Sequence, residues 1–414
     1  MSSVTRGYRI RAYPNAVQRR WLDCWFGATR WLWNTALEIR SEAYRECGLR
    51  LSGNEISRWL TQWKHTRGHE WLAQVPATCL TQCLRTQDTA FTNFFGCRTR
   101  YPRVKRKGTK GTLRFQGVGT AWTRGIVSLP KLGTLKLAEA LPKDQGEIVK
   151  RPHLVTLTRD AVGRYHVSFS AAVVLSQLPI VQRSVGVDLG LRHLATLSTG
   201  EKIRNPKRYH ARLRYLRQQQ RCLARRQPGS RRREKQRQRV ARAHARVRQE
   251  RQYSLHRLTT RLVQEFDLIC IEDLNVKGLA RGRLARGLYD AAFSELRRQL
   301  TYKSDWYGRV LVEVDRWYPS SKTCSRCQHT LDELRRCERE WTCPRCGVCH
   351  DRDINAGRNL LAEGLSQLAG RDDRDLRVDA RGACPEAKIL EQVLAEEARS
   401  GHGNIACQQQ ALFP

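Results

Sequence analysis

The chain has 414 residues and a formal net charge of +37, with 76 Lys and Arg against 39 Asp and Glu. Its length favours two to four structural units, and so high a charge is best tolerated when a polyanion, most commonly nucleic acid, neutralises it. A polybasic membrane protein is disfavoured because the sequence has no run of about 18 apolar residues and begins without a signal-peptide core. The 15 scattered cysteines argue against a secreted disulfide framework, so we expect a soluble cytoplasmic protein.

Residues 1–182 predict a β unit that is interrupted by helices. A short strand over residues 7–14 precedes a helix, and helical stretches continue to about residue 95. From residue 100 to about 178 the sequence alternates as strands do, which predicts a small β-barrel or sandwich completed by the first strand. The residues expected on one face of the first helix are Trp21, Leu22, Trp25, Ala28, Leu32 and Ala36.

The helical part allows two interpretations. It is either a bundle with a basic surface or a lobe that grips nucleic acid, because Arg beside exposed aromatic rings suits both phosphates and stacked bases. Composition does not separate the two.

From residue 183 onward the pattern predicts an α/β unit with a basic helical hairpin. A strand, a tight turn and a second strand occupy residues 183–200. Residues 202–251 contain 20 Lys and Arg but only two acids, Glu234 and Glu250, and Pro228-Gly229-Ser230 divides them into two helices. Such a run is either a solvated face or a nucleic-acid contact. Recurring apolar residues favour packed helices, namely Leu213, Leu216, Leu223, Val240, Val247 and Leu255.

The remaining chain predicts two more strands and a charged tail. A buried strand over residues 268–271 is followed by a helix near 294–307 and a strand over 308–315. Beyond about residue 370 the sequence is charged and poor in apolar residues, so we expect it to be largely disordered.

Four cysteines have the spacing of a zinc site. Cys324, Cys327, Cys343 and Cys346 form two C-x2-C pairs, which can supply four thiolates to one tetrahedral Zn²⁺. A site closed by four protein ligands is structural rather than catalytic. Other possible ligands lie nearby, so one of them could replace a cysteine of this set. They are Cys337, Cys349 and His350.

Three acids lie at the boundaries of predicted elements, an arrangement that suggests a second metal site. Asp188 and Glu272 each end a strand, and Asp353 lies where the last helix starts. Each alone is more often a turn or capping residue. Together they would repel one another unless cations lay between them, and their oxygen atoms suit Mg²⁺ or Mn²⁺. Two such ions can hydrolyse a phosphodiester.

Two further acids, Asp273 and Asp351, lie near members of this set in the sequence. Asp273 would point to the opposite face from Glu272 if the strand continues. Asp351 competes with Asp353, and spacing alone does not choose between them. The zinc knuckle precedes the last acid directly, so a rigid thiolate site can fix where Asp353 points.

At these residues the sequence resembles TnpB, an RNA-guided nuclease of bacterial and archaeal insertion sequences that is related to miniature type V CRISPR effectors. The matching segments are GVDLGLRHLAT, ICIEDLNVKGL, WYPSSKTCSRC and HDRDINAGRNL, in the family's order. The N-terminal segment RAYPNAVQRRWLDCWFGATRWLWNTALE and YPRVKRKG are also similar to the family. The resemblance spans roughly residues 7–362.

The resemblance implies an α/β multidomain fold. An RNase H-like (RuvC) nuclease domain with a zinc-knuckle insertion would be joined to a β-barrel wedge domain and a helical recognition lobe. The implied ranges are 1–14 for the first wedge strand, 15–99 for the lobe, 100–182 for the barrel, 183–323 for the nuclease domain with its basic hairpin at 202–265, 324–349 for the zinc-binding insertion that contacts target nucleic acid, 350–369 for the last nuclease segment and 370–414 for the tail.

The resemblance also implies an activity. A guide RNA from the transposon end would pair with double-stranded target DNA beside a short motif read by the protein, and one RuvC site would cleave the DNA by two-metal-ion hydrolysis. Carried over, Asp188, Glu272 and Asp353 would hold catalytic Mg²⁺ or Mn²⁺, and the four cysteines would hold structural Zn²⁺. The protein would act in the cytoplasm, away from membranes, as a monomer in its ribonucleoprotein.

Three other functions remain as alternatives. A nuclease-inactive RNA-guided DNA-binding regulator would have lost the three acids, which this chain retains. A strand-joining transposase would use the same two-metal chemistry. A zinc-ribbon DNA-binding protein would use its acids only for structure.

Overall fold

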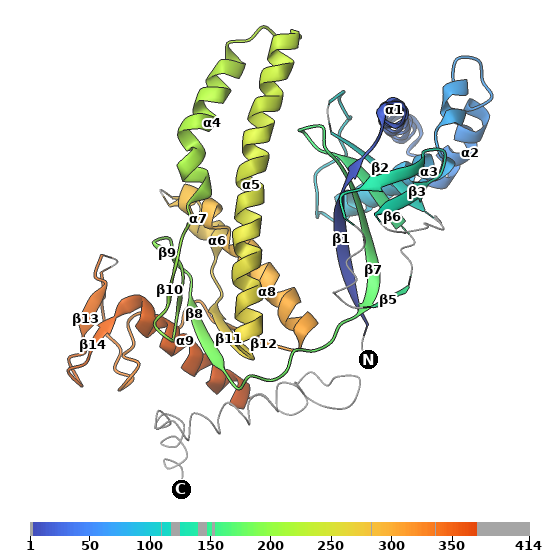
Figure 1. Ribbon diagram of the computed structural model, residues 1–414. Coiled ribbons are helices and arrows are strands. Elements are labelled where there is room, and N and C mark those ends of the chain that lie inside the picture. Colours follow the sequence, from blue (N-terminus) through green and yellow to red (C-terminus); the bar gives the residue numbers. More distant parts are fainter. Residues whose placement is uncertain are drawn as a thin grey trace. The chain divides into compact units, whose positions relative to one another are not determined.

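The computed structural model describes residues 3–108, 110–116, 125–139, 147–150, 154–282, 284–335 and 337–370. The chain forms two compact units, Ser3–Val174 and the part from Leu175 onward (Figure 1). This division lies eight residues before the predicted boundary at 182. The tail that was predicted to be disordered lies, from residue 371 onward, outside the described residues. No described helix is long and apolar enough to cross a membrane.

The unit Ser3–Val174 is built on one antiparallel sheet. The strand order is β2-β6-β7-β1-β4-β3, and β5 also pairs with β7. As predicted, the first strand joins the later ones, because β1 pairs with both β7 and β4. All strands described in this unit belong to this one sheet. Of the two predicted alternatives, barrel or sandwich, a sandwich of two separate sheets is therefore excluded among these strands. The bounds are β1 Ser3–Tyr13, β2 Gly111–Gln116, β3 Ile126–Leu129, β4 Gly133–Leu137, β5 Glu147–Lys150, β6 Leu154–Arg159 and β7 Tyr165–Val174.

The helices of this unit follow the predicted pattern with one exception. They are α1 Ala16–Cys47, α2 Gly53–Trp63, the 3-10 helix η1 Glu70–Gln74 and α3 Ala77–Phe95. Asn15 and Gln18 form a capping box that starts α1. Five of the six predicted core residues of α1 are buried, but Trp21 is 39% exposed and was wrongly placed. It lies at the edge of the apolar stripe, with its ring tilted against Trp25.

The second unit contains a mixed five-stranded sheet. Its order is β10-β9-β8-β11-β12, in which β11 runs parallel to both β8 and β12. Leu268 pairs with Ser184 and Ile271 with Val187, so Glu272 comes level with Asp188 at one edge of the sheet. The bounds are β8 Ser184–Asp188, β9 His193–Leu197, β10 Lys202–Arg204, β11 Leu268–Glu272 and β12 Val310–Val314.

Helices cover both faces of this sheet. Ile269 and Ile271 pack with residues of α5 (Arg231–Glu265) and α8 (Phe293–Tyr307) in one core. The alternate residues Leu268 and Cys270 pack with α9 (Arg352–Ala369) in another, as expected for a strand buried on both faces. Two short helices, α6 (Val276–Leu279) and α7 (Ala285–Ala291), were not predicted.

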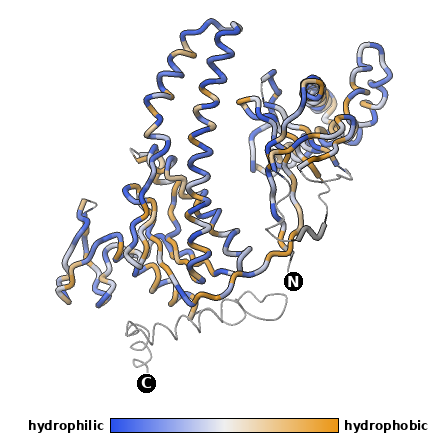
Figure 2. Tube along the Cα trace, viewed as in Figure 1, coloured by the Kyte–Doolittle hydropathy of each residue, from blue (hydrophilic) through white to orange (hydrophobic). Residues whose placement is uncertain are grey.

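The predicted basic hairpin is confirmed, with a later start. It consists of α4 (Arg208–Ala224) and α5, and Ser230 caps α5 by accepting a hydrogen bond from the Arg233 amide. Residue 202 was too early a boundary, because Lys202–Arg204 forms β10 instead. Leu216 and Val247 are buried between the two helices, whereas the rest of their surface is largely hydrophilic (Figure 2).

Helix α9 lies unusually close to strand β8. A Cβ atom placed on Gly186 would lie 1.9 Å from the carbonyl oxygen of Gly357 and 2.8 Å from the amide nitrogen of Leu361. Both atoms belong to the backbone of α9 and cannot rotate away. Glycine at 186 therefore allows the helix to approach the sheet, and with it the first turn that carries Asp353.

We predict that Gly186→Ala forces α9 away from the sheet. Overpacking of this kind costs about 1–3 kcal/mol, which corresponds to a melting temperature lowered by about 2–10 °C. Gly7→Ala is the matched control, since Gly7 also lies in a strand but has open space where its Cβ would be. Equal melting temperatures for the two variants in differential scanning calorimetry would contradict the close approach.

Candidate functional site

Three acids meet at the carboxyl edge of the second sheet. Asp188 ends β8, Glu272 ends β11, and Asp353 lies in the first turn of α9. All three side chains are half-buried. The sequence predicted these positions, and the parallel pairing of β8 with β11 together with the close packing of α9 brings them to one place.

The acids influence one another electrostatically. Burial, followed by the charges of Asp353 and Glu272, raises the pKa of Asp188 to about 7, against the opposing effect of Arg352 and Arg339. Burial, followed by the charge of Asp273, also raises the pKa of Glu272. A divalent cation would relieve this repulsion, and carboxylate oxygens are the ligands that Mg²⁺ and Mn²⁺ prefer.

An arginine already neutralises one of these acids. The Arg339 guanidinium donates a hydrogen bond to the Asp353 carboxylate over 3.0 Å. Among the described residues, the three carboxylates do not form a group whose ligand atoms all lie within 4.8 Å of one another. The three carboxylates would therefore have to move closer together to bind one ion jointly.

The two neighbouring acids have other partners. Asp351 is the N-cap of α9, where it accepts hydrogen bonds from the amides of Asp353 and Ile354 and pairs with Lys202 over 2.5 Å. Burial alone would raise its pKa, but the Lys202 ammonium and these amides outweigh burial and lower it. Asp273 pairs with Arg297 and Arg316, whose hydrogen bonds lower its pKa.

These contacts bear on the choice left open by the spacing. Both oxygens of Asp351 accept hydrogen bonds, Oδ1 from the helix amides and Oδ2 from Lys202, whereas the hydrogen bond from Arg339 uses Oδ1 of Asp353. Asp353 therefore remains the third acid of the proposed site.

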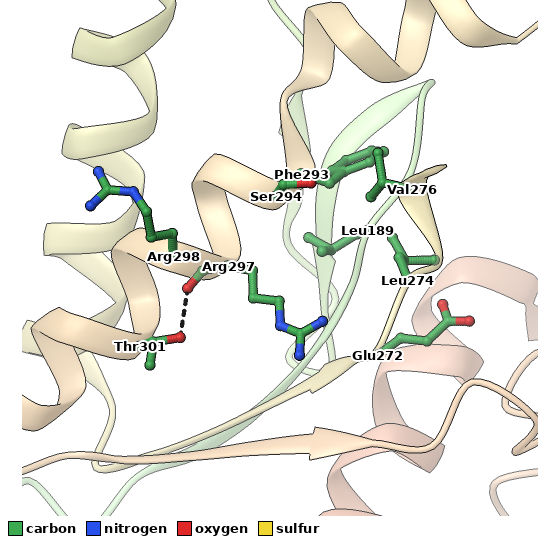
Figure 3. A pocket seen from close by; sticks show the side chains of 9 residues that line it. All are labelled: Leu189, Glu272, Leu274, Val276, Phe293, Ser294, Arg297, Arg298 and Thr301. Carbon is green, nitrogen blue, oxygen red and sulfur yellow. Dashed lines mark hydrogen bonds between the residues drawn. The ribbon is translucent and has the colours of Figure 1, made fainter. Parts of the chain in front are cut away.

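A pocket of about 260 Å³ opens beside Glu272. Figure 3 shows the apolar side chains of its lining grouped together, with the Glu272 carboxylate and the Arg297 guanidinium below them. The apolar group consists of Leu189, Leu274, Val276 and Phe293. Such a lining could receive an apolar part of a substrate beside the acids.

The four predicted cysteines come together in the zinc knuckle. The sulfur atoms of Cys324, Cys327, Cys343 and Cys346 all lie within 4.8 Å of one another. Each pair is held by the same turn, in which the first cysteine's carbonyl accepts a hydrogen bond from the residue four positions later, Gln328 or Gly347. Both of these residues have positive φ angles. The donor set fits a tetrahedral Zn²⁺.

The spare ligands stand outside this group of thiols. Cys337 and Cys349 are exposed. His350 is buried, and its Nε2 atom lies 3.0 Å from the Cys324 sulfur, where it can serve as a hydrogen-bond partner. His350 belongs to β14 (Cys349–Asp351), which pairs with β13 (Glu340–Thr342).

Two buried asparagines of α9 connect the helix to the knuckle. The side-chain amides of Asn355 and Asn359 donate hydrogen bonds to the carbonyl of Thr323, at 2.7 and 2.6 Å. Asn355 also accepts from the amide of Ser325 at 2.9 Å. This role was not predicted, although two asparagines one helical turn apart indicate a shared helix face. The thiol cluster and Asp353 thus belong to one connected element.

The comparisons with family models cover most of the described chain. A model described as "Probable transposase" matches residues 164–283, and one described as "Cas12f1-like, TNB domain" matches residues 293–360. A model described as "Helix-turn-helix domain" matches residues 1–48, and the described part of this range contains β1 and helix α1.

Several relatives are similar to this chain along most of its length. A Streptomyces pristinaespiralis protein, named as a candidate RNA-guided DNA endonuclease, is 42% identical over 90% of this chain and 92% of its own length. Similarly named proteins of Escherichia coli and Mycobacterium tuberculosis are 29% and 31% identical, over 88% and 86% of this chain and 93% and 85% of their own.

The fold has a counterpart among solved structures. The protein of the Cas12f1–sgRNA–target DNA complex matches with a TM-score of 0.53 and 12% identity, over 86% of this chain and 98% of that one. On the strength of the relatives that match it along nearly its whole length, the chain belongs to the TnpB family.

Proposed function

We propose that this protein is an RNA-guided DNA endonuclease of an insertion sequence, with one metal-dependent RuvC-like site. The observation that carries the proposal is the meeting of Asp188, Glu272 and Asp353 at one sheet edge, where their charges interact. The extended similarity to relatives named as candidate RNA-guided DNA endonucleases supports the same reaction.

The three acids would hold divalent cations, Mg²⁺ or Mn²⁺, beside the scissile phosphate. When bound, such ions activate a water molecule and stabilise the leaving oxygen of a phosphodiester. Burial, followed by the charges of Asp353 and Glu272, raises the pKa of Asp188, and bound cations would offset this effect. Arg339 donates a hydrogen bond to the Asp353 carboxylate beside them.

The partners proposed are a guide RNA from the transposon end and double-stranded target DNA. The hairpin of α4 and α5 supplies much of the positive charge of its unit, and its arginines are mostly exposed. A polyanion such as RNA would neutralise this surface. The solved complex that shares the fold contains guide RNA and target DNA.

The alternatives predict different products. A nuclease-inactive regulator would not need three neighbouring acids, which together with burial raise the pKa of Asp188. A transposase would join strands. This alternative is retained because one matching family model is described as "Probable transposase".

The first test is to purify the protein with its native locus, sequence the RNA that accompanies it and supply matched DNA with a randomised flank. We expect Mg²⁺-dependent cuts that Asp188→Ala abolishes while RNA and DNA binding persist, because the acids would hold the ions and not the nucleic acid.

Glu363→Gln is the matched control, because it removes a carboxylate from helix α9, the helix that carries Asp353. Among the described side-chain hydrogen bonds, Glu363 takes part only in the one that it accepts from Gln367. Binding without cuts would establish the regulator instead. Joined products, or activity without RNA, would establish the transposase.

A second prediction concerns the thiol cluster. Cys343→Ser should lower the zinc content from about one per chain and reduce cleavage, because the knuckle anchors the helix that carries Asp353. Cys349→Ser, in the same knuckle but outside the cluster, should keep both. Metal analysis of the two purified variants decides, and full zinc content in Cys343→Ser would refute the assignment.

A third prediction concerns the basic hairpin. Replacing the exposed residues Arg239, Arg242 and Arg246 with Gln should weaken RNA binding and flatten its log–log salt dependence by about 0.7–0.9 per lost phosphate contact. The same three positions changed to Lys keep the charge and should keep the slope. If the slope is unchanged in the Gln variant, the hairpin is a solvated face.

A further inference from the structure

Trp317 is the most exposed of the large hydrophobic residues in the described chain. Its exposed fraction is 84%, whereas the next two, Tyr253 and Tyr289, reach 65%. No ring-stacking or cation–π partner of Trp317 is found among the described residues. A tryptophan exposed to this degree contributes nothing to a core, so its large apolar face is available to a ligand.

The position of Trp317 relates it to the three acids. Strand β12 runs parallel to β11, with Val314 opposite Glu272, and the amide of Asp273 donates to the Val314 carbonyl over 2.9 Å. Trp317 follows three residues after Val314. It therefore emerges at the same edge of the sheet as the carboxylates.

The segment that carries Trp317 is firmly held at its beginning. The Asp315 carboxylate accepts from the Trp317 amide over 2.7 Å, and the Asp315 carbonyl accepts from the Tyr318 amide over 3.1 Å. Arg316 pairs with Asp273, which also pairs with Arg297 over 2.5 Å. The backbone on which the exposed ring sits is thus fixed by its neighbours.

The end of the segment is fixed as well. Asn359 of α9 donates to the Ser320 carbonyl over 2.7 Å, and the amide of Thr323 donates to the Pro319 carbonyl. Because the backbone is held at both ends of the segment, stacking on the ring would cost little backbone entropy, which favours its use as a binding platform.

We propose that Trp317 is a stacking platform for one unpaired base of the DNA strand that the three acids cleave. This inference rests on the proposed function and specifies how its site holds the substrate. The acids and their ions would bind the scissile phosphate, and a base a short distance along the strand would lie on the indole. The ion pairs of Arg316 and Arg297 with Asp273 and Glu313 leave this region without a large excess of charge, which suits a base better than a phosphate.

A consequence concerns the form of the substrate. Inside a duplex, both faces of a base are covered by the neighbouring base pairs, so a base can stack on Trp317 only after it has left the duplex. The platform therefore selects a strand that is single-stranded at this position. Stacking tolerates all four bases, so little sequence preference should arise from it.

The test combines substitutions in the protein with single abasic sites in the cleaved strand. The ribonucleoprotein is supplied with target DNA in which one nucleotide at a time, around the cut, lacks its base. Trp317→Ala should raise KM or slow cleavage by about 5- to 150-fold, the range for loss of one stacked base, and Trp317→Phe should retain most of the activity.

The decisive readout is coupling. In the wild-type protein, one abasic position should slow cleavage to a similar extent as Trp317→Ala does. In Trp317→Ala that same position should have no further effect, because the interaction is already absent. Tyr289→Ala removes another exposed ring of the same unit and should leave both cleavage and the abasic profile unchanged.

The outcomes separate this inference from the proposed function. Unaltered cleavage by Trp317→Ala, or effects that simply add at every abasic position, would overturn the platform. If the wild-type protein cuts no DNA, the proposed function fails. The binding affinity for the same set of abasic DNAs is then measured in an Asp188→Ala background, with and without Trp317→Ala. Coupling in that binding experiment supports the platform, and its absence at every position overturns it.

Discussion

The close approach between the backbones of α9 and β8 is the constraint on which the site depends. Gly186 and Gly357 have no side chains between them, and their peptide groups lie nearly in contact. This brings the first turn of α9, with Asp353, to the edge where Asp188 and Glu272 end their strands. Burial, together with the charges of Asp353 and Glu272, raises the pKa of Asp188, and Arg339 moderates the negative charge at this edge. An arrangement of this kind is typical of a site that is completed by cations.

The thiol cluster and the three acids share a structural frame. Asn355 and Asn359 donate hydrogen bonds to the carbonyl of Thr323, next to Cys324 of the cluster, and Asp351 caps the same helix while it pairs with Lys202 of β10. The thiol cluster, the start of α9 and the loop of Trp317 are therefore linked by hydrogen bonds between buried groups. This linkage gives a physical reason for the short distance in sequence between the thiol cluster and Asp353, because the cluster fixes the start of the helix that carries this acid.

Much of this could be predicted from local patterns, and what could not depends on contacts between distant residues. The cysteine spacing identified the thiol cluster, and alternating or continuous apolar runs located β8, β11 and β12. Spacing could not choose between Asp351 and Asp353, because the choice depends on which of them caps the helix. The pairs Arg339–Asp353 and Lys202–Asp351 and the asparagine bridge arise only from tertiary packing, and so does the exposure of Trp21 at the edge of its stripe.

Helix α5 has a further consequence, because its two ends belong to different environments. Near its C-terminus, Leu255, Leu258 and Leu262 are part of the main core of the second unit, whereas its first half packs against α4 through the small cluster around Leu216 and Val247. At 35 residues it is about 50 Å long. Local opening should therefore cost progressively less free energy toward the Pro228-Gly229 turn. The outer hairpin can thus gain or lose helical turns during evolution, and so change its reach, while the carboxylates at the other end keep their register.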